Sequence, residues 1–262
     1  MHHEEQRNPR AAGFRVTRSI LRMKHLVATL CVLAAACASA AARAADSCRL
    51  PSELDKPRLQ RVDCSNDVAP DSWVLALSWS PKHCATVDPR RPKNAVQCGL
   101  NRFGFVVHGL WGQRAAARGK CEQPRHCAKS LVPLQTIRET LCTIPGVELI
   151  QGEWQKHGTC SGMTPEAYFA KARALSSALV KPDVLTLVNE RNEVKAGAIT
   201  EAFVAANRAS GLFAEAVAVR VASGNLLDEV RVCYGLDFDY AACTGGRTPA
   251  KQTIKVVRPR ER

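Results

Sequence analysis

The chain has 262 residues, of which 46% are hydrophobic, and a formal net charge of +13 at pH 7. This content is enough for one sizeable core, and the absence of sequence repeats, low-complexity blocks and Gly/Ser linkers after the N-terminal region excludes a repeat array. The positive charge favours polyanionic partners such as nucleic acid or an anionic membrane, but charge alone defines no chemistry.

Residues 1–45 have the features of a secretory signal peptide. Basic residues precede the apolar run LVATLCVLAAACASAAA, and the small residues of ARAAD offer a cleavage site, so the mature domain is expected over residues 46–262. A working leader that starts at Met23 is an open alternative, because MKHLVATL is itself a well-formed start. Cys37 leaves a lipoprotein anchor as another, whereas the apolar run is too short to predict a membrane span. Without the leader the chain keeps 30 basic and 22 acidic residues, a net charge of +8.

Ten cysteines follow the leader, an even number that predicts up to five disulfides in an exported chain. They are Cys48, Cys64, Cys84, Cys98, Cys121, Cys127, Cys142, Cys160, Cys233 and Cys243. No C-x-x-C pair occurs among them, so a zinc site is not favoured. Proximity suggests the pairs Cys84–Cys98 and Cys233–Cys243 and leaves the other pairings open. The expected location is therefore secreted or periplasmic, and the alanine-rich leader favours a bacterial source.

Three segments have the pattern of strands. In DSWVLALSWSP (71–81) large side chains alternate with small ones, which predicts a strand with one heavily packed face. RFGFVVHG (102–109) is apolar on both faces and rich in aromatic and β-branched residues, so we expect it in the middle of a sheet. DEVRVCYG (228–235) alternates apolar with other residues and predicts a third strand.

Two segments predict helices. TPEAYFAKARALSSALV (164–180) begins with Thr164 as an N-cap, and TEAFVAANRASG (200–211) predicts a second capped helix closed by Gly211. Because helices and strands do not alternate regularly, the expected class is α+β, with an antiparallel central sheet flanked by helices in one disulfide-stapled domain. The basic tail from Gly245 is expected to be loosely held at its end.

Two motifs carry candidate chemistry. FGFVVHGLWGQ places His108 at the end of an apolar strand near Trp111, where a core histidine is the alternative interpretation. GEWQKHGTC spaces Glu153 and His157 four residues apart, so on a helix they share a face with Lys156. A surface ion-pair helix is the alternative there.

Together the motifs indicate acid–base catalysis on a phosphodiester. Two imidazoles that titrate near neutral pH are what a general base and a general acid need on opposite sides of one phosphorus atom. Each contributes on the order of 10²–10⁴ in rate. Lys156 is placed to stabilise the negative charge of the transition state, so the histidine pair, the lysine and the basic surface fit one kind of substrate.

FVVHGLW and EWQKHGTC resemble the two active-site segments of the ribonuclease T2 family of secreted endoribonucleases, and LALSWSPKHC resembles that family's early strand. The resemblance runs from about Asp71 to Cys243. It implies cleavage of single-stranded RNA to 2′,3′-cyclic phosphate ends, with His157 as the general base and His108 as the general acid.

The same resemblance implies further roles and absences. Glu153 and Lys156 match positions that stabilise the phosphorane, and Trp111 and Trp154 are candidate substrate-binding residues. No cofactor and no metal are implied. We expect a monomer without a membrane partner, and DNA, which lacks the 2′-hydroxyl, should be bound at most weakly and left uncut.

Two departures from the family pattern qualify the resemblance. Gly152 stands where the family usually has a histidine that holds the phosphate, so altered phosphate binding is expected, with Lys156 or an arginine from elsewhere in compensation. Gly112 replaces a proline that commonly follows HGLW.

Two alternatives and several questions stay open. Cys160 with His157 as a thiol nucleophile and its base is one alternative, although the spacing does not suit the usual attack geometry. A catalytically weakened RNA-binding or inhibitory protein on the same fold is the other, and Gly152 favours it. Base preference and pH optimum do not follow from the sequence. Arg114, Arg118 and Lys120 are open between contacts with phosphates and plain solvation, His126 is interpreted as a loop histidine, and His83 has no assigned role.

Overall fold

The computed structural model describes residues 48–260. The expected signal peptide, residues 1–45 with its alternative start at Met23, lies outside the described residues. The strands are β1 (Ser72–Trp79), β2 (Phe105–Gln113), β3 (Glu193–Lys195), β4 (Val217–Ala222), β5 (Leu226–Tyr234) and β6 (Thr253–Lys255). The helices are α2 (Ser80–Thr86), α3 (Pro92–Asn94), α4 (Leu134–Thr140), α5 (Val147–Lys156), α6 (Pro165–Ala178) and α7 (Ala196–Ala206).

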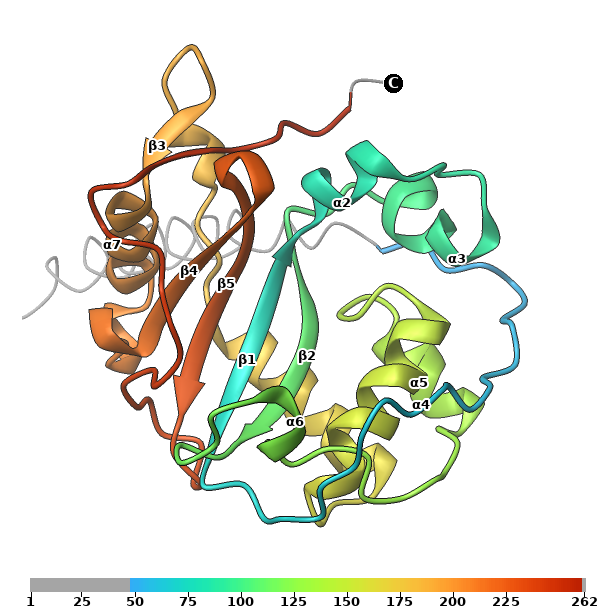
Figure 1. The fold of residues 1–262 in the computed structure, drawn as a ribbon. Coiled ribbons are helices and arrows are strands. Elements are labelled where there is room, and N and C mark those ends of the chain that lie inside the picture. The colour runs from blue at the N-terminus through green and yellow to red at the C-terminus, as the bar shows by residue number, and fades with distance from the viewer. Residues whose placement is uncertain (1–47, 261–262) are drawn as a thin grey trace, which may run out of the picture. The chain divides into compact units, whose positions relative to one another are not determined.

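A mixed arrangement of sheet and helices confirms the α+β class (Figure 1). The strand order is β2-β1-β5-β6-β3, with β4 also paired to β5. Between strands of the described residues, all long pairings are antiparallel, and only the bridge from Leu226 to Lys255 is parallel. The strands expected near 71–81 and 228–235 are present as β1 and β5. The large side chains of β1 face the core, where Leu75 and Leu77 are fully buried.

The position expected for the strand at 102–109 was wrong. This segment forms β2, which lies at the edge of the sheet and pairs with β1 alone. Instead of a second neighbouring strand, the helices α5 and α6 pack against β2. The chain before α5 also covers part of its free edge, because Val107 N–H donates to Thr143 O at 2.9 Å. Helices thus provide the burial that a neighbouring strand was expected to provide.

The two expected helices are both present, with one correction. α6 is capped by the Thr164 side chain, which accepts from Ala167 N–H, and its inward stripe includes fully buried Tyr168 and Ala172. α7 begins at Ala196, so Thr200 lies inside it and is not its cap. Gly211, with φ +80°, ends a separate 3₁₀ turn that follows α7. The chain leaves the helix by this tighter turn, which needs the left-handed residue.

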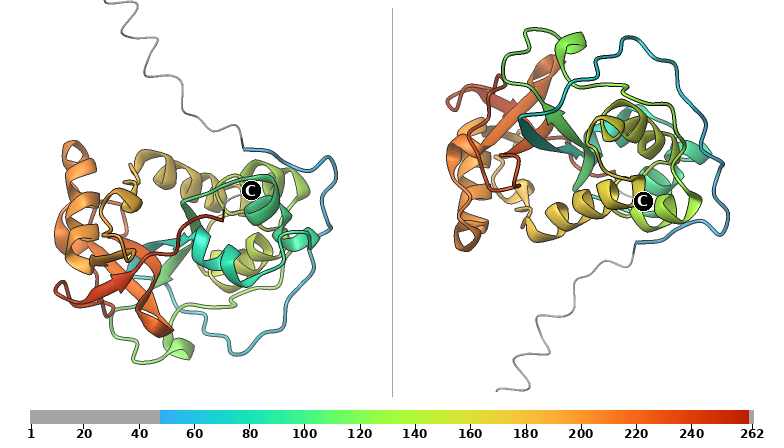
Figure 2. Two further views of the ribbon diagram at one scale, coloured as in Figure 1. Left: turned by 90° about the horizontal axis from the view of Figure 1, so that it is seen from above. Right: turned by 90° about the horizontal axis from the view of Figure 1, so that it is seen from below.

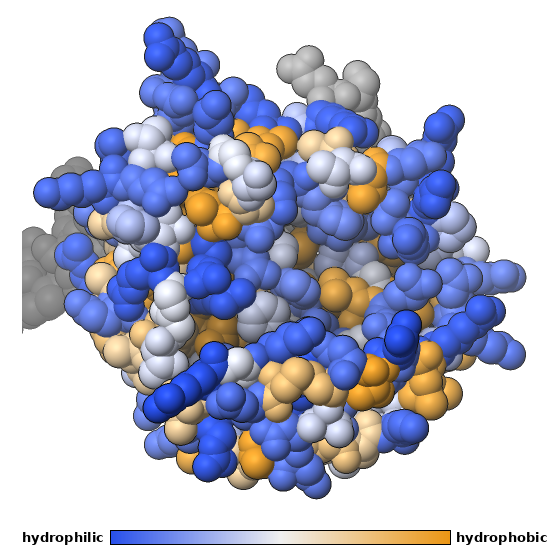
Figure 3. Space-filling model, in the orientation of Figure 1, coloured by the Kyte–Doolittle hydropathy of each residue, from blue (hydrophilic) through white to orange (hydrophobic). Residues whose placement is uncertain are grey.

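α7 and the group of α4, α5 and α6 lie at opposite ends of the sheet. α7 packs beside β4, whereas α4, α5 and α6 gather beside β2 (Figures 1 and 2). The face seen in Figure 3 is mostly hydrophilic, with apolar residues in small separate patches. Within residues 48–260, no helix is long and apolar enough to span a membrane.

Five disulfides staple this domain. The expected pairs Cys84–Cys98 and Cys233–Cys243 are confirmed. The three pairings that the sequence left open are Cys48–Cys142, Cys64–Cys121 and Cys127–Cys160 in the structure. Two of these fasten the N-terminal arm, residues 48–69, which runs past α4 and α5 before the chain enters β1 (Figure 1).

The basic tail docks on the domain as far as Val257, whereas its end, which was expected to be loosely held, includes residues 261–262 outside the described residues. It contributes β6 to the sheet, and Val256 is buried. The indole N–H of Trp79 donates to Val257 O at 2.8 Å. Basic composition therefore did not prevent docking of the tail, because its apolar residues alternate into the core.

Candidate active site

His108 sits at a bulge in β2. In the pairing with β1, Ala76 faces Gly109 and Leu77 faces Val107, so His108 is the extra residue. Bulges re-aim a side chain out of the regular strand alternation. The imidazole is 36% exposed, and its Nδ1 lies 2.6 Å from Glu229 Oε1 on β5.

The environment of His108 favours its cationic form. Burial lowers the pKa of His108, but the hydrogen bond to Glu229 and the charges of Glu153 and Glu229 outweigh burial, so its pKa is raised overall. The same pairing lowers the pKa of Glu229 against the opposing effect of its burial. The two shifts both favour an imidazolium held by a carboxylate.

Glu153 joins the two motifs. It projects from α5 into the core, where its Oε2 accepts from the Trp111 indole N–H at 2.6 Å and its Oε1 lies 3.7 Å from His108 Nε2. Burial raises the pKa of Glu153, and the neighbouring His108 partly offsets this. Gly109 has to be a glycine, because a Cβ there would overlap Glu153 Oε2 and Trp111 Nε1.

His157 follows the last residue of α5, as the spacing of GEWQKHGTC predicts. The helix ends at Lys156, and a 3₁₀ turn, Gly158–Cys160, follows. Burial lowers the pKa of His157 well below the usual value, with a further contribution from Lys156. Its Nδ1 is buried without a partner, which leaves Nε2 as the nitrogen available to a substrate. The ring centroid of Trp111 is 5.6 Å away.

Lys156 lines a cavity of about 330 Å³ between α5 and the N-terminal arm. The floor of this cavity is the α5 stripe of Glu148, Gly152 and Lys156, which recur every four residues. Gln60 of the arm covers the stripe, and a Cβ on Gly152 would lie 2.7 Å from Gln60 Oε1. The arm thus crosses the helix at Gly152, where the absence of a side chain leaves room for Gln60.

The arm is held to α5 by paired amides. Gln60 N–H donates to Gln155 Oε1, and Gln155 Nε2 donates back to Gln60 O, both at 2.8 Å. The Gln60 side chain donates to Glu148 O. Gln155 is almost fully buried, so its amide depends on the arm for both partners.

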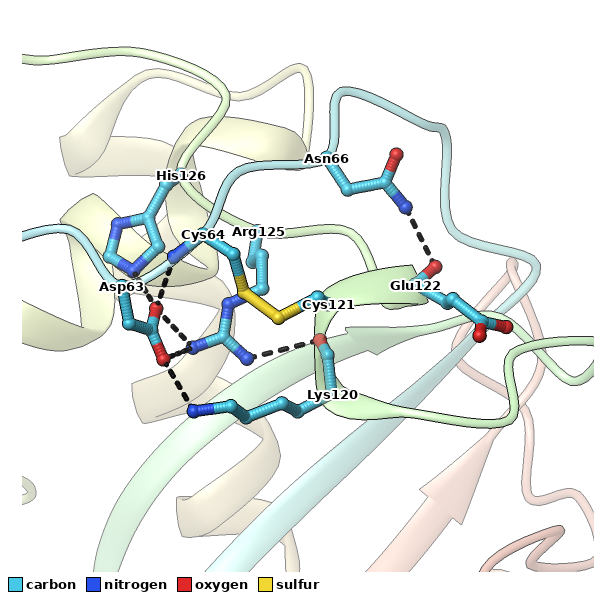
Figure 4. Close-up of a disulfide and its surroundings, with 8 residues drawn as sticks. All are labelled: Asp63, Cys64, Asn66, Lys120, Cys121, Glu122, Arg125 and His126. Atoms are coloured by element: carbon cyan, nitrogen blue, oxygen red, sulfur yellow. Dashed lines mark hydrogen bonds and ion pairs between the residues drawn. A yellow bond between two sulfur atoms is a disulfide. The ribbon is translucent and has the colours of Figure 1, made fainter.

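A charged cluster fixes the next residues of the arm (Figure 4). Asp63 accepts from Arg125 on both carboxylate oxygens and from Lys120 Nζ at 3.0 Å. The hydrogen bond from Lys120 and that from Cys64 N–H lower the pKa of Asp63. His126 Nε2 lies 3.4 Å from Asp63 Oδ1, and its side chain is 8% exposed. Lys120, which the sequence left open between phosphate contact and solvation, and His126, expected to be a loop histidine, therefore both help to anchor the arm beside the Cys64–Cys121 disulfide.

Of the expected site residues, the structure brings His108, Trp111, Glu153 and His157 together, with Lys156 at the edge of the adjoining cavity. It does not bring Trp154 to them. Trp154 is 4% exposed, its indole donates to Ser130 Oγ, and it packs against Tyr168. It is therefore a core residue on the inward face of α5. The Cys160 thiol nucleophile is also excluded in this structure, because Cys160 is bridged to Cys127.

Sequence reasoning missed Glu229 and Arg231. Both oxygens of Glu229 are used: Oε1 by His108, and Oε2 by Arg231 Nε and Nη2 at 3.0 and 2.9 Å. The available signal was an acid and a base two residues apart on one strand, which places them on the same face. Among the described residues, no group of three His, Cys, Asp or Glu side chains could hold a metal ion.

Comparison with known proteins gives consistent results. The model of the Ribonuclease T2 family matches residues 70–243. A probable ribonuclease of Haemophilus influenzae is 44% identical over 124 residues, which are 43% of this chain and 44% of that protein. Ribonuclease I of Escherichia coli is 31% identical over 134 residues, covering 38% and 50%. The chain spans about half the length of the curated relatives it matches.

Solved structures share the fold. An RNase-related protein from Calystegia sepium superposes with a TM-score of 0.57 at 20% identity, over 72% of this chain and 97% of that one. RNase NT in complex with 5′-AMP has a TM-score of 0.55 at 18% identity, over 72% and 98%. The fold, the two histidine segments in this order and the match over residues 70–243 place the chain in the ribonuclease T2 family.

Proposed function

We propose that the protein is an endoribonuclease that cleaves single-stranded RNA by transesterification. The observation that carries this proposal is the opposite shift of two histidine pKa values around one Trp111 ring: the pKa of His157 is lowered and that of His108 is raised. Near neutral pH this gives a neutral imidazole that can accept a proton and a cationic one that can donate.

In the proposed reaction the substrate supplies its own nucleophile. His157 takes the proton of a ribose 2′-hydroxyl as O2′ attacks the adjacent phosphorus. The P–O5′ bond breaks, and His108 Nε2 gives its proton to the departing O5′. The products are a 2′,3′-cyclic phosphate and a free 5′-hydroxyl, and slow hydrolysis of the cycle to a 3′-phosphate follows.

The remaining site groups stabilise charge and geometry in this scheme. Lys156, whose side chain lines the open cavity, meets the negative charge of the equatorial oxygens. Glu153 holds Trp111 and faces His108 Nε2, so it also keeps the acid close to the leaving oxygen. These steps use neither a cofactor nor a metal ion.

The proposal extends to partner and location. RNA is favoured over DNA because only RNA carries the attacking hydroxyl, so DNA is bound weakly and not cut. We expect a monomer. The five disulfides favour an oxidising compartment, either the periplasm or the medium, which agrees with the signal peptide expected in residues 1–45.

The test is to incubate the disulfide-bonded chain from about Asp46 with a short RNA and its DNA analogue in excess EDTA, and to identify the product ends by mass spectrometry. We expect cyclic phosphate ends from RNA only, and their loss with His108→Ala and with His157→Ala. Intact RNA in the presence of the folded wild-type protein would overturn the proposal and favour a binding or inhibitory role on the same fold.

A further inference from the structure

Glu229 is a buried carboxylate with both of its oxygens committed. Its side chain is 8% exposed, and it accepts from His108 Nδ1 on one oxygen and from the Arg231 guanidinium on the other. Burial of a carboxylate is unfavourable unless its hydrogen bonds are satisfied. A carboxylate placed at this depth with two charged partners indicates a specific task.

The sheet is built to let His108 reach Glu229. β1 lies between β2 and β5, and its residues Ala76 and Ser78 pair directly with Arg231 and Glu229. Directly paired residues of an antiparallel sheet point to the same face, so two small side chains separate the imidazole from its partner. The bulge at His108 supplies the re-aimed side chain. The alternation of large and small residues in β1 thus serves the core on one face and the site on the other.

Arg231 closes this arrangement into a ring of contacts. Its guanidinium lies over the Trp111 ring at 4.9 Å, and Trp111 in turn donates to Glu153. Glu153 Oε1 faces His108 Nε2 at 3.7 Å. Each group is therefore held by its two neighbours, and rotation of His108 would break the ring.

We propose that Glu229 is the positioning residue of the general acid: it fixes the proton of His108 on Nδ1, so that Nε2 carries the proton given to the departing O5′. This inference rests on the proposed function. Arg231 holds the carboxylate in place by a two-point contact, as is usual for arginine with a carboxylate.

Other charged groups also act on His108 and have to be separated from Glu229. They are Glu153, Lys156 and His157 from α5 and its end, Arg231 beside Glu229 on β5, and His83 on α2. Within the described residues, none of these groups forms a hydrogen bond with the His108 ring, whereas Glu229 does. A neutral amide in its place keeps an acceptor for Nδ1–H and removes the charge, which isolates the effect.

The test compares Glu229→Gln with the wild type on two substrates. With an RNA dinucleotide we expect kcat to fall about tenfold or more at unchanged KM. The alkaline limb of the pH–rate profile should shift to lower pH by about one unit. With uridine 3′-(4-nitrophenyl) phosphate, whose leaving group needs no proton, we expect a change of less than about threefold. A residue with only a structural role would lower both rates together.

Asp228→Asn is the matched control, since it removes the same charge one residue away, where the carboxylate pairs with Lys82. It should leave both rates and the alkaline limb unchanged. Loss of RNA cleavage with His108→Ala but normal rates and an unmoved limb with Glu229→Gln would overturn the positioning role and leave the proposed function intact. A wild type that does not cleave RNA would instead overturn the proposed function.

A second measurement needs no variant. The ¹⁵N shifts of His108 in the wild type, followed by NMR to high pH, report which nitrogen keeps the proton when the ring is neutral. We expect Nδ1 to stay protonated, and a neutral ring with its proton on Nε2 would contradict the inference even if Glu229→Gln failed to fold.

Discussion

The site has two walls that are built in different ways. The sheet wall, formed by β1, β2 and β5, holds His108 through its hydrogen bond to Glu229, which reaches across β1 from β2 to β5. The arm wall, formed by α5 and residues 48–69, is held by the Gln60–Gln155 amides, the Asp63 ion pairs and the Cys64–Cys121 disulfide (Figure 4). The sheet wall lies within the family match, whereas the arm precedes it.

This difference suggests a division of labour. The sheet wall fixes the protonation and direction of the general acid, so small displacements there should affect the chemical step. The arm wall covers the cavity beside Lys156 and fills the space over Gly152, so changes there should affect substrate binding and local stability more than chemistry. The following changes test this contrast.

The largest effect is expected from Gly109→Ala in the sheet wall. The new Cβ would overlap the Glu153 carboxylate and the Trp111 indole, so both have to move. Because a displacement near 1 Å costs about 10²-fold in rate, we expect kcat on RNA to fall by at least about that factor. Gly119→Ala is the control, since its Cβ would meet nothing nearer than 3.9 Å. Circular dichroism checks the fold, and near-normal activity of folded Gly109→Ala would contradict the close packing.

The pH dependence should show the two histidines directly. Because burial lowers the pKa of His157, the base stays neutral to lower pH than an ordinary histidine. The acid limb of the profile therefore lies at a lower pH than an ordinary histidine would give. The net raised pKa of His108 keeps the acid protonated to higher pH, so the alkaline limb lies above it. The rate should fall about tenfold per pH unit beyond each limb. Steady-state kcat/KM from pH 4 to 9 measures this, and a narrow bell centred on two ordinary histidines would contradict it.

Sequence reasoning predicted a part of each wall, His108 on β2 and Glu153 on α5, and missed another part of each. The two motifs identified His108, Glu153 and His157 because their spacing is local: four residues on a helix, or the end of one strand. Glu229 was missed because its partner is 121 positions away, and only strand pairing brings the two together.

The edge position of β2 was missed for a related physical reason. An apolar segment indicates that both faces of a strand are buried, but not whether both of its edges are paired; here β2 pairs with β1 on one edge, and α5 and α6 pack against it. Likewise, the glycine at 152 was recognised as a departure from the family pattern, but the arm that crosses it could not be inferred, since the arm contact joins residues about 90 positions apart.

A smaller effect is expected from two disulfides, one that fastens the arm and one that fastens the turn after α5. Chain entropy predicts about 4 kcal/mol of stabilisation for each of Cys64–Cys121 and Cys127–Cys160, because the effect depends only weakly on loop length, which differs between sequence separations of 57 and 33. Cys127–Cys160 anchors the turn that carries His157, so its replacement by two serines should lower kcat about tenfold. The same replacement of Cys64–Cys121 should leave kcat within about twofold and raise KM, since only the arm is released.

Urea unfolding and RNA kinetics on both double variants measure these effects, well below the unfolding transition. Equal loss of kcat in the two variants would show that the arm contributes to the chemical step, and the division of labour between the walls would then be wrong. Equal losses of unfolding free energy in the two variants, together with different kcat values, would support the division of labour.

The smallest effect tests why residue 152 is a glycine. Gly152→Ala should gain about 1 kcal/mol from helix propensity inside α5. It should lose a similar amount, because the Cβ at 2.7 Å displaces the Gln60 amide from its hydrogen bond to Glu148 O. The net change in unfolding free energy is then close to zero. In a Gln60→Ala background the amide is already gone, so the same substitution should stabilise the protein by about 1 kcal/mol. Urea unfolding of the four proteins in this cycle gives the coupling, and strictly additive values would mean that the arm does not press on α5 at this position.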